Sequence, residues 1–180
     1  FRKYICKPDL QMNAKIAVMQ PYLFPYIGYF QLLNAADKFV ILDDVNFIKK
    51  GWINRNKILV NNEPAYFTIP LVKSSQNKLI KDIAISYENN WQEKFLKTIE
   101  RSYSKAPFFE VAYNLISKII LRDENKISDL IYFSLMDIKE YLCLKTDIVK
   151  SSGVYNNSEF KGEERIIDIC LKENSEYYVN

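Results

Sequence analysis

The sequence contains no histidine, and this absence excludes several kinds of chemistry at once. Ser-His-Asp and Cys-His catalytic groups need an imidazole, the usual zinc sites contain one, and histidine is the most convenient general base at neutral pH. Any reaction that this chain catalyses must therefore use carboxylates, amides, hydroxyls or cationic side chains.

Cysteines and long apolar runs are also scarce. The three cysteines, Cys6, Cys143 and Cys170, are far apart, which favours free buried thiols in a reducing cytosol over a disulfide framework or a metal site. No apolar run reaches the roughly 18 to 20 residues that a membrane-spanning helix needs, and the N-terminus lacks a secretory apolar segment. We expect a cytoplasmic protein without a membrane span.

The composition is that of an ordinary globular protein. The 180 residues are 48% hydrophobic and 26% charged, with 25 basic and 22 acidic side chains that leave a net charge of +3. This near balance argues against a nucleic-acid partner, and the length suits one domain. Residues 1–12 show no clear period and are interpreted as a tail or an upstream remnant, whereas residues 13–180 form the expected single domain.

The first half of that domain begins with a βαβ pattern and continues with a hairpin. Short apolar runs at 15–20 and 38–44 predict two buried strands, and a helix is predicted between them from Pro25. Two β-rich runs in residues 56–71 flank an Asn-Asn-Glu-Pro turn, which indicates an antiparallel hairpin. Residues 82–86 are a candidate third strand.

The second half is mainly helical. Helices are predicted after an Asn cap at 89–90, from Pro107 and after a Ser128 cap. Two more strands, at 146–151 and 176–179, flank a helix at 162–173. We expect the following side chains to be core: Trp91, Phe95, Ile99, Leu135 and Ile138. The predicted fold class is α/β, a Rossmann-like, mainly parallel sheet with an inserted β-hairpin and a helical block.

Polar side chains are concentrated directly after the second predicted strand. They are Asp43, Asp44, Asn46, Lys49, Lys50, Asn54, Arg55 and Asn56, with Trp52 among them. Ligands of parallel α/β sheets bind at the carboxyl ends of strands, where this cluster begins. The lysines and the arginine can bind phosphate, and the aspartates can hold a metal, a ribose hydroxyl or an amine. Charged loop residues are also often simply solvated, so that interpretation stays open.

The stretch "MQPYLFPYIGYF", residues 19–30, leaves the neighbouring strand at the same predicted edge. Helical spacing turns Ile27 and Phe30 toward the core, and we expect Gln20, Tyr22 and Tyr26 to face a pocket shared with the polar cluster. Tyrosine and tryptophan rings can stack on a base or a sugar. The alternative is that this aromatic run only packs.

Four segments together carry a resemblance to a known family. "QPYLFPYIGYF", "ADKFVILDDVNFIKKGWINRNKI", "YSKAPFF" and "KGEERIIDIC" are similar, in this order, to the signature of the WbqC-like protein family, found in bacterial gene clusters for surface polysaccharides such as O-antigen. The resemblance covers about residues 15 to 178. Members commonly have a histidine where this chain has Met19, and they tend to continue past the last strand, so we expect a C-terminal truncation here.

The resemblance implies a transferase that adds an acyl or aminoacyl group to the amine of a nucleotide-linked amino sugar. The expected catalytic residues are Gln20, Asp43 and Asp44. The expected substrate-binding residues are Tyr22, Tyr26, Asn46, Lys49, Lys50, Trp52, Asn54, Arg55 and Asn56, and no metal is assigned. A fainter similarity to nucleotidylyltransferase-like enzymes, including amide ligases that use ATP, makes ATP or an activated acyl donor the candidate co-substrate. The alternative is a non-catalytic protein that binds nucleotide sugars or assists assembly in the same pathway.

Overall fold

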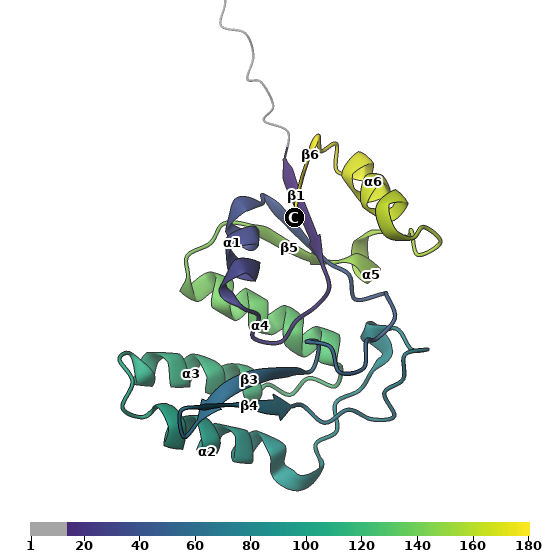
Figure 1. The fold of residues 1–180 in the computed structure, drawn as a ribbon. Helices are drawn as coiled ribbons and strands as arrows, with labels where there is room; N and C mark the ends of the chain where they lie inside the picture. The colour runs from purple at the N-terminus through teal and green to yellow at the C-terminus, as the bar shows by residue number, and fades with distance from the viewer. Residues whose placement is uncertain (1–13) are drawn as a thin grey trace, which may run out of the picture.

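The structure is a computed structural model that describes residues 14–180, so the predicted tail at 1–12 and the expectation for Cys6 lie outside the described part (Figure 1). The strands are β1 (Lys15–Met19), β2 (Lys38–Ile41), β3 (Arg55–Val60), β4 (Glu63–Thr68), β5 (Asp147–Lys150) and β6 (Tyr177–Val179). The helices are α1 (Ile27–Ala35), α2 (Trp91–Tyr103), α3 (Phe109–Ile120), α4 (Ile127–Tyr141), α5 (Ser151–Val154) and α6 (Gly162–Lys172), and two short 3-10 turns are η1 (Ile80–Asp82) and η2 (Glu88–Asn90). The chain thus has the mixed α/β composition that the sequence predicts.

Four strands form one parallel sheet in the order β5–β2–β1–β6. β1 and β2 pair in parallel with Met19 opposite Ile41, and the Leu42 N–H donates to the Met19 carbonyl at 2.8 Å. The predicted βαβ unit is therefore confirmed. Because all four strands run the same way, their carboxyl ends lie along one edge of the sheet.

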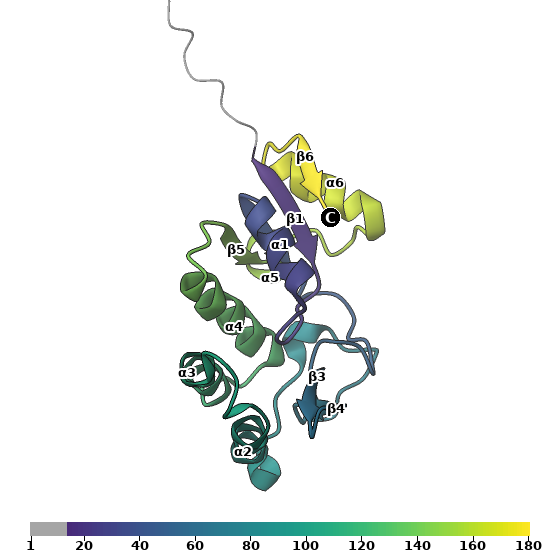
Figure 2. The ribbon, with the colours of Figure 1, turned by 60° about the vertical axis from the view of Figure 1, so that its left-hand side comes forward.

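Helices cover both faces of this sheet. Alternate residues point to opposite faces, so Ala17, Phe39 and Ile41 pack with α1 and α4, whereas Ile16 and Val40 pack on the side of α6. Figures 1 and 2 show α1 and α4 on one side of the sheet and α6 on the other. Asp43 and Asp44 follow β2, an inner strand of the sheet, so their loop starts between the two layers of helices.

The inserted hairpin, β3 and β4, is antiparallel as predicted. Its turn consists of Asn61 and Asn62, both in the left-handed region with φ of 53° and 64°, a conformation that Asn tolerates and that matches the twist of a two-residue hairpin. One face of the hairpin packs on α2 and α3, with the rings of Phe67 and Phe95 4.6 Å apart. Hairpin, α2 and α3 form a second packing unit below the sheet, which Figure 2 shows from the side.

The buried face of α1 differs from the prediction. Ile27 is 72% exposed, whereas Tyr29 is buried and Phe30 is half-buried. The helix begins at Ile27 rather than Pro25, and Tyr29 and Leu33, four residues apart, face the sheet instead. Tyr29 fits there because its ring lies 5.1 Å from Phe39 and its hydroxyl donates to the Gln20 carbonyl at 3.0 Å. Burial raises the pKa of Tyr29 above its usual range, which keeps that donor protonated.

Three predicted element boundaries are also wrong. Residues 82–86 begin at the end of the 3-10 turn η1 and make only isolated bridges, such as Leu71 with Ile85, so they do not form a strand of the hairpin sheet. The third helix begins at Phe109, two residues after Pro107. Ser128 lies buried in the first turn of α4 and does not cap it, because the helix already begins at Ile127 and Lys126 occupies the N-cap position.

Most of the predicted core is confirmed. Phe95, Ile99 and Leu135 are buried, while Trp91 and Ile138 are half-buried against the core. Cys143 is exposed, contrary to the expectation of a buried thiol, because it follows α4 in a left-handed turn with φ of 55°. None of the helices within residues 14–180 is long and apolar enough to cross a membrane.

Candidate functional site

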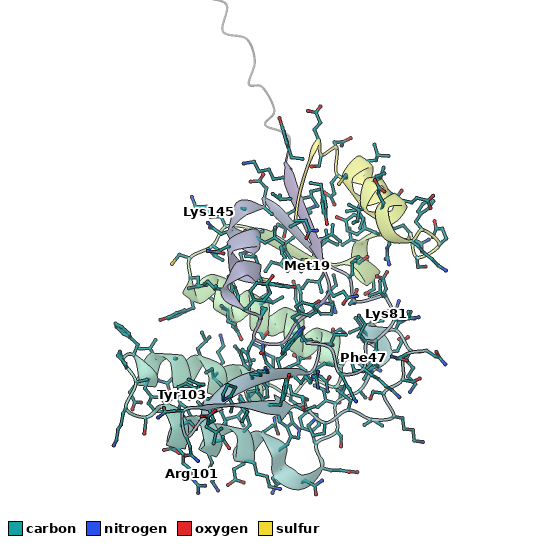
Figure 3. All side chains as sticks on the ribbon, viewed as in Figure 1. Met19, Phe47, Lys81, Arg101, Tyr103 and Lys145 are labelled. Carbon is teal, nitrogen blue, oxygen red and sulfur yellow. The ribbon has the colours of Figure 1, made fainter. Side chains whose placement is uncertain are left out.

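The carboxyl edge of the parallel sheet brings together side chains from three strand ends. Gln20 follows β1, Asp43 and Asp44 follow β2, and Ser151 and Ser152 follow β5. Figure 3 labels Met19 at this end of β1. The three residues expected to be catalytic therefore lie at one edge of the sheet, although only the two aspartates are buried.

Asp43 fixes the start of α5. Its Oδ1 accepts the Ser152 N–H at 2.9 Å, and its Oδ2 accepts the Ser152 hydroxyl at 2.6 Å. Its backbone carbonyl accepts the Lys81 N–H at 2.8 Å. Through these bonds Asp43 joins three segments at this edge: the residues after β2, the start of α5 and the turn η1.

Asp44 forms the centre of the site with Arg165 of α6. Both side chains are more than nine-tenths buried, and Nη2 of Arg165 lies 2.6 Å from Oδ2 of Asp44. The same nitrogen donates to the Ser151 hydroxyl at 2.9 Å, and Nε donates to Oδ1 of Asn157 at 3.1 Å. The other oxygen of Asp44, Oδ1, is buried without a hydrogen-bond partner. Buried carboxylate oxygens normally have donors, so this atom needs an explanation.

Two cavities meet at Asp44. The smaller, of about 180 Å³, is also lined by Lys81, Ser152 and Ser158. The larger, of about 420 Å³, is lined by Asn46, Lys161, Arg165 and apolar side chains of α6. A donor placed here could pair with Asp44, and the two lysines could bind phosphate oxygens.

A second layer of contacts supports Arg165. Asn157 is fully buried, accepts from Arg165 and donates through Nδ2 to Asp168 at 2.7 Å. Hydrogen bonds from Lys172 and Asn157 hold the pKa of Asp168 below its usual range. The guanidinium is thus fixed by side chains that come from its own helix and the loop before it.

The polar residues around β3 have other partners. Nδ2 of buried Asn54 donates to the Ile69 carbonyl at 2.8 Å, and Nδ2 of Asn56 donates to the Leu23 and Phe24 carbonyls at 3.1 and 2.7 Å. Asn54 therefore anchors the hairpin base, and Asn56 anchors the "PYLFPY" loop.

Arg55 and its neighbouring lysines lie outside the Asp44 cavities. Nε of Arg55 donates to the Gly51 carbonyl at 3.1 Å, Nη2 donates to the Lys50 carbonyl, and the guanidinium lies 4.8 Å from the Tyr66 ring. Lys49 and Lys50 are exposed. None of these three cations lines either cavity at Asp44.

The expected stacking residues are also dispersed. Tyr22 packs beside Tyr29 with ring centroids 5.9 Å apart, and Trp52 is exposed 6.3 Å from the Tyr66 ring. Tyr26 is 68% exposed. Gln20 is partly exposed beyond β1, and it lines neither cavity at Asp44.

A larger apolar groove of about 560 Å³ lies between the hairpin, α2 and α3. Phe24, Phe95, Phe109 and Tyr113 line it, and of the expected site residues Tyr26 and Asn56 do so. The groove contains no carboxylate, and the Asn56 amide is already bonded to backbone. Its size exceeds that of the Asp44 cavities, but the groups able to do proton chemistry lie at the sheet edge.

Arg165, Ser151, Ser152, Lys81 and Lys161 are the site residues that sequence reasoning missed. One signal was available for Arg165: it stands four residues before Ile169 in "KGEERIIDIC", so it shares the buried face of α6. A charged side chain on a buried helical face normally has a buried partner of opposite charge.

Comparison with known proteins shows where this chain belongs. It is 28% identical over 168 residues to the uncharacterized protein Rv1507c of Mycobacterium tuberculosis, an alignment that covers 92% of this chain and 71% of that protein. No solved structure matches the chain. The sequence pattern of the WbqC-like protein family matches residues 20–180. This match includes both aspartates at the sheet edge and Arg165, and the chain belongs to the WbqC-like protein family.

Proposed function

We propose that this chain is a transferase that places an acyl or aminoacyl group on the free amine of a nucleotide-linked amino sugar. The proposed pathway is the synthesis of O-antigen or another surface polysaccharide. Family membership supports the proposal, and the observation that carries it is the unpaired Oδ1 of Asp44. We also propose that the fold is Rossmann-like, which the strand order β5–β2–β1–β6 supports.

The unpaired oxygen of Asp44 suits an amine. Arg165 fixes Oδ2, so the carboxylate cannot turn away, and Oδ1 remains free to accept a hydrogen bond beside two cavities. An ammonium or amino group of the sugar would supply the missing donor with a charge-assisted bond. Gln20 follows the adjacent strand outside both cavities, so in this proposal its amide would contact only a part of the substrate that extends beyond them.

The phosphate end of the substrate would lie on two lysines. Lys81 lines the smaller cavity and Lys161 the larger one, each together with Asp44. In the proposal these lysines take the role that the sequence assigns to Lys49, Lys50 and Arg55. Asn46 lines the larger cavity and keeps its expected role in substrate binding.

In the proposed reaction, the amine nitrogen attacks the carbonyl carbon of an activated acyl group. A C–N bond forms, the bond between that carbon and its phosphate or thiol breaks, and the leaving group departs with the bonding electrons. The proton lost by the amine passes to Asp44 Oδ1 and then to solvent, which is general base catalysis by a desolvated carboxylate. ATP or an already activated acyl donor would supply the activated carbonyl.

A binding protein of the same pathway is the second candidate, and the Asp44–Arg165 pair favours it. An aspartate whose position is fixed by a buried guanidinium can hold an amino group through a hydrogen bond to its unpaired oxygen, and that role needs no turnover. Binding of an amino sugar without product formation from any acyl donor would support this second candidate.

The test compares pairs of nucleotide sugars that differ in one amine, such as UDP-glucosamine and UDP-glucose. In at least one pair, the amino sugar should raise the melting temperature more than its partner without the amine. A ligand that binds the native state and not the unfolded state raises the melting temperature, so the difference reports on binding of the amine. Mass spectrometry with ATP and candidate carboxylic acids, or with acyl thioesters, then detects amide formation. Equal stabilisation by both members of every pair would contradict the role of Asp44.

Variants locate the binding site independently of folding. Lys81→Ala should weaken binding about tenfold, whereas Lys145→Ala should not, because Lys145 precedes β5 at the opposite end of the sheet (Figure 3). Asp44→Asn should abolish the preference for the amine. If Asp44→Asn does not fold, the Lys81 and Lys145 pair still tests the site.

A further inference from the structure

The outward side of the hairpin carries a cluster that the proposed function does not use. Side chains alternate along a strand, so Arg55, Lys57 and Leu59 of β3 share one face. The register places Tyr66 of β4 opposite Lys57 on that face, and Trp52 lies beside Tyr66. We define these five side chains as the outer hairpin face.

This face exposes large apolar side chains. Trp52 is 41% exposed, Leu59 47% and Tyr66 55%. The opposite face of the hairpin packs on α2 and α3, and in Figure 2 no helix or strand of the described chain covers the side that points away from them. Two aromatic rings and a leucine gathered on one open surface indicate a binding surface rather than scattered exposure.

The same face is cationic. Arg55 and Lys57 lie 4.8 and 5.0 Å from the centre of the Tyr66 ring. Neither of them forms an ion pair with another described residue. Arg55 donates to two backbone carbonyls, but no described carboxylate neutralises either cation, so both charges remain available to attract an anion beside the Tyr66 ring.

The stretch of sequence that contains the hairpin is basic as a whole. Residues 46–81 contain seven basic side chains and one acidic side chain, Glu63, a net charge of +6, whereas the other 144 residues, with 18 basic and 21 acidic, carry −3. The near-neutral total of the chain hides this separation. Glu63 belongs by alternation to the other face of the hairpin, so it does not neutralise the outer one.

We propose that the outer hairpin face binds the surface of a membrane that contains anionic phospholipids. Tryptophan and tyrosine prefer the headgroup level, basic side chains pair with lipid phosphates, and an aliphatic side chain gains from the acyl boundary. Leu59 distinguishes this partner from a nucleic acid, because a phosphate backbone offers nothing to an exposed leucine. The proposal does not depend on the transferase activity.

The first test measures partitioning onto vesicles of phosphatidylcholine, with and without about 30% phosphatidylglycerol, in about 0.1 M salt. The protein should bind only the anionic vesicles. Lys49 and Lys50 are exposed in the loop before β3, where Arg55 bonds to the Lys50 carbonyl, so their charges add to that of the face. Lys49→Ala/Lys50→Ala/Lys57→Ala should weaken binding about 100-fold, since each cation near the surface contributes roughly a factor of five. The matched triple variant Lys94→Ala/Lys105→Ala/Lys145→Ala removes the same charge from exposed lysines elsewhere and should stay within about threefold of the unmodified protein.

The second test reports on Trp52 directly. In Trp91→Phe the remaining tryptophan is Trp52, and its fluorescence should shift to the blue on anionic vesicles; in Trp52→Phe the shift should be absent. Failure to bind anionic vesicles, equal losses in the two triple variants, or tighter binding of a DNA or RNA oligonucleotide at the same phosphate concentration would each overturn the proposal.

Discussion

The sheet edge and the hairpin unit are held together in different ways. At the sheet edge, hydrogen bonds to carboxylates join residues far apart in the sequence: the Ser152 hydroxyl bonds to Asp43 across 109 positions, and Arg165 forms an ion pair with Asp44 across 121. In the hairpin unit, apolar rings such as Phe67 and Phe95 interlock across a short stretch of chain. The stability of the first region should therefore be most sensitive to the loss of a charged partner, and that of the second to the loss of side-chain volume.

The strongest test of this difference is the removal of one partner from the buried ion pair. Arg165→Met should lower the free energy of unfolding by about 3 to 5 kcal/mol, because the carboxylate of Asp44 would remain buried without its counter-charge. Urea unfolding measures this change. Lys172→Met, on the same helix but half-exposed, is the control and should leave the midpoint nearly unchanged. Equal effects of the two variants would mean that the pair does not hold the edge.

The next test removes volume from the hairpin unit. Phe95→Ala should cost on the order of 3 kcal/mol or more, since it leaves a cavity beneath the Phe67 ring. Phe108→Ala removes the same side chain from a site that is 84% exposed and should change stability by less than about 0.5 kcal/mol. A near-neutral Phe95→Ala would show that the hairpin and α2 are not packed as described.

The two regions also differ in how well the sequence predicts them. Apolar periodicity identifies β1, β2, the hairpin and the buried face of α2, because each of these signals is contained in a few neighbouring residues. It fails for α1, where Tyr29 displaces Ile27 from the core because its hydroxyl finds the Gln20 carbonyl and its ring finds Phe39. Gln20 follows β1 and Phe39 lies in β2, so the pattern of residues within the helix could not reveal these partners.

The site shows the same limit. The position of Asp43 and Asp44 after a strand predicts that they lie at the carboxyl edge, and both do. The four-residue spacing of Arg165 and Ile169 indicates that Arg165 faces the core. It does not indicate Asp44 as the partner, because the distance along the chain between these two residues carries no periodic signal. The cluster of Lys49, Lys50 and Arg55 is close to Asp44 in sequence, but Arg55 bonds to the Lys50 and Gly51 carbonyls and leaves the edge.

A third test concerns the contact between the two regions. Asp137 of α4 accepts hydrogen bonds at 2.7 Å from Lys118 and from Arg122, which extend from α3 and the residues after it. Burial opposes ionisation of Asp137, but these two cations outweigh it and hold its pKa below the usual range. A depressed carboxyl pKa contributes stability above its unfolded value, near 3.9, and that contribution is lost as the pH falls through the folded pKa.

The pH dependence should follow from this sign. At pH 7, Asp137→Asn should lower the unfolding free energy by on the order of 2 kcal/mol, and the difference from the unmodified protein should shrink progressively as the pH falls from about 4 through the lower folded pKa. Asp82→Asn, at an exposed position that forms no ion pair with another described residue, should give the same difference at both pH values. Urea titrations at pH 7 and pH 3 make the measurement. A gap of the same size at pH 3 as at pH 7 would assign the effect to packing.

The smallest expected effect belongs to Lys50, at the start of the hairpin unit. Its side chain is exposed, and the contact it makes through Arg55 uses its backbone carbonyl, which any residue provides. Lys50→Ala should therefore change stability by less than about 0.5 kcal/mol. Because φ is 61° at this position, Lys50→Gly should be neutral or slightly stabilising, whereas Lys50→Pro should destabilise the loop, since proline fixes φ near −65°. Thermal melts of the three variants separate side chain from backbone, and a fall of several degrees for Lys50→Ala would make this lysine structural.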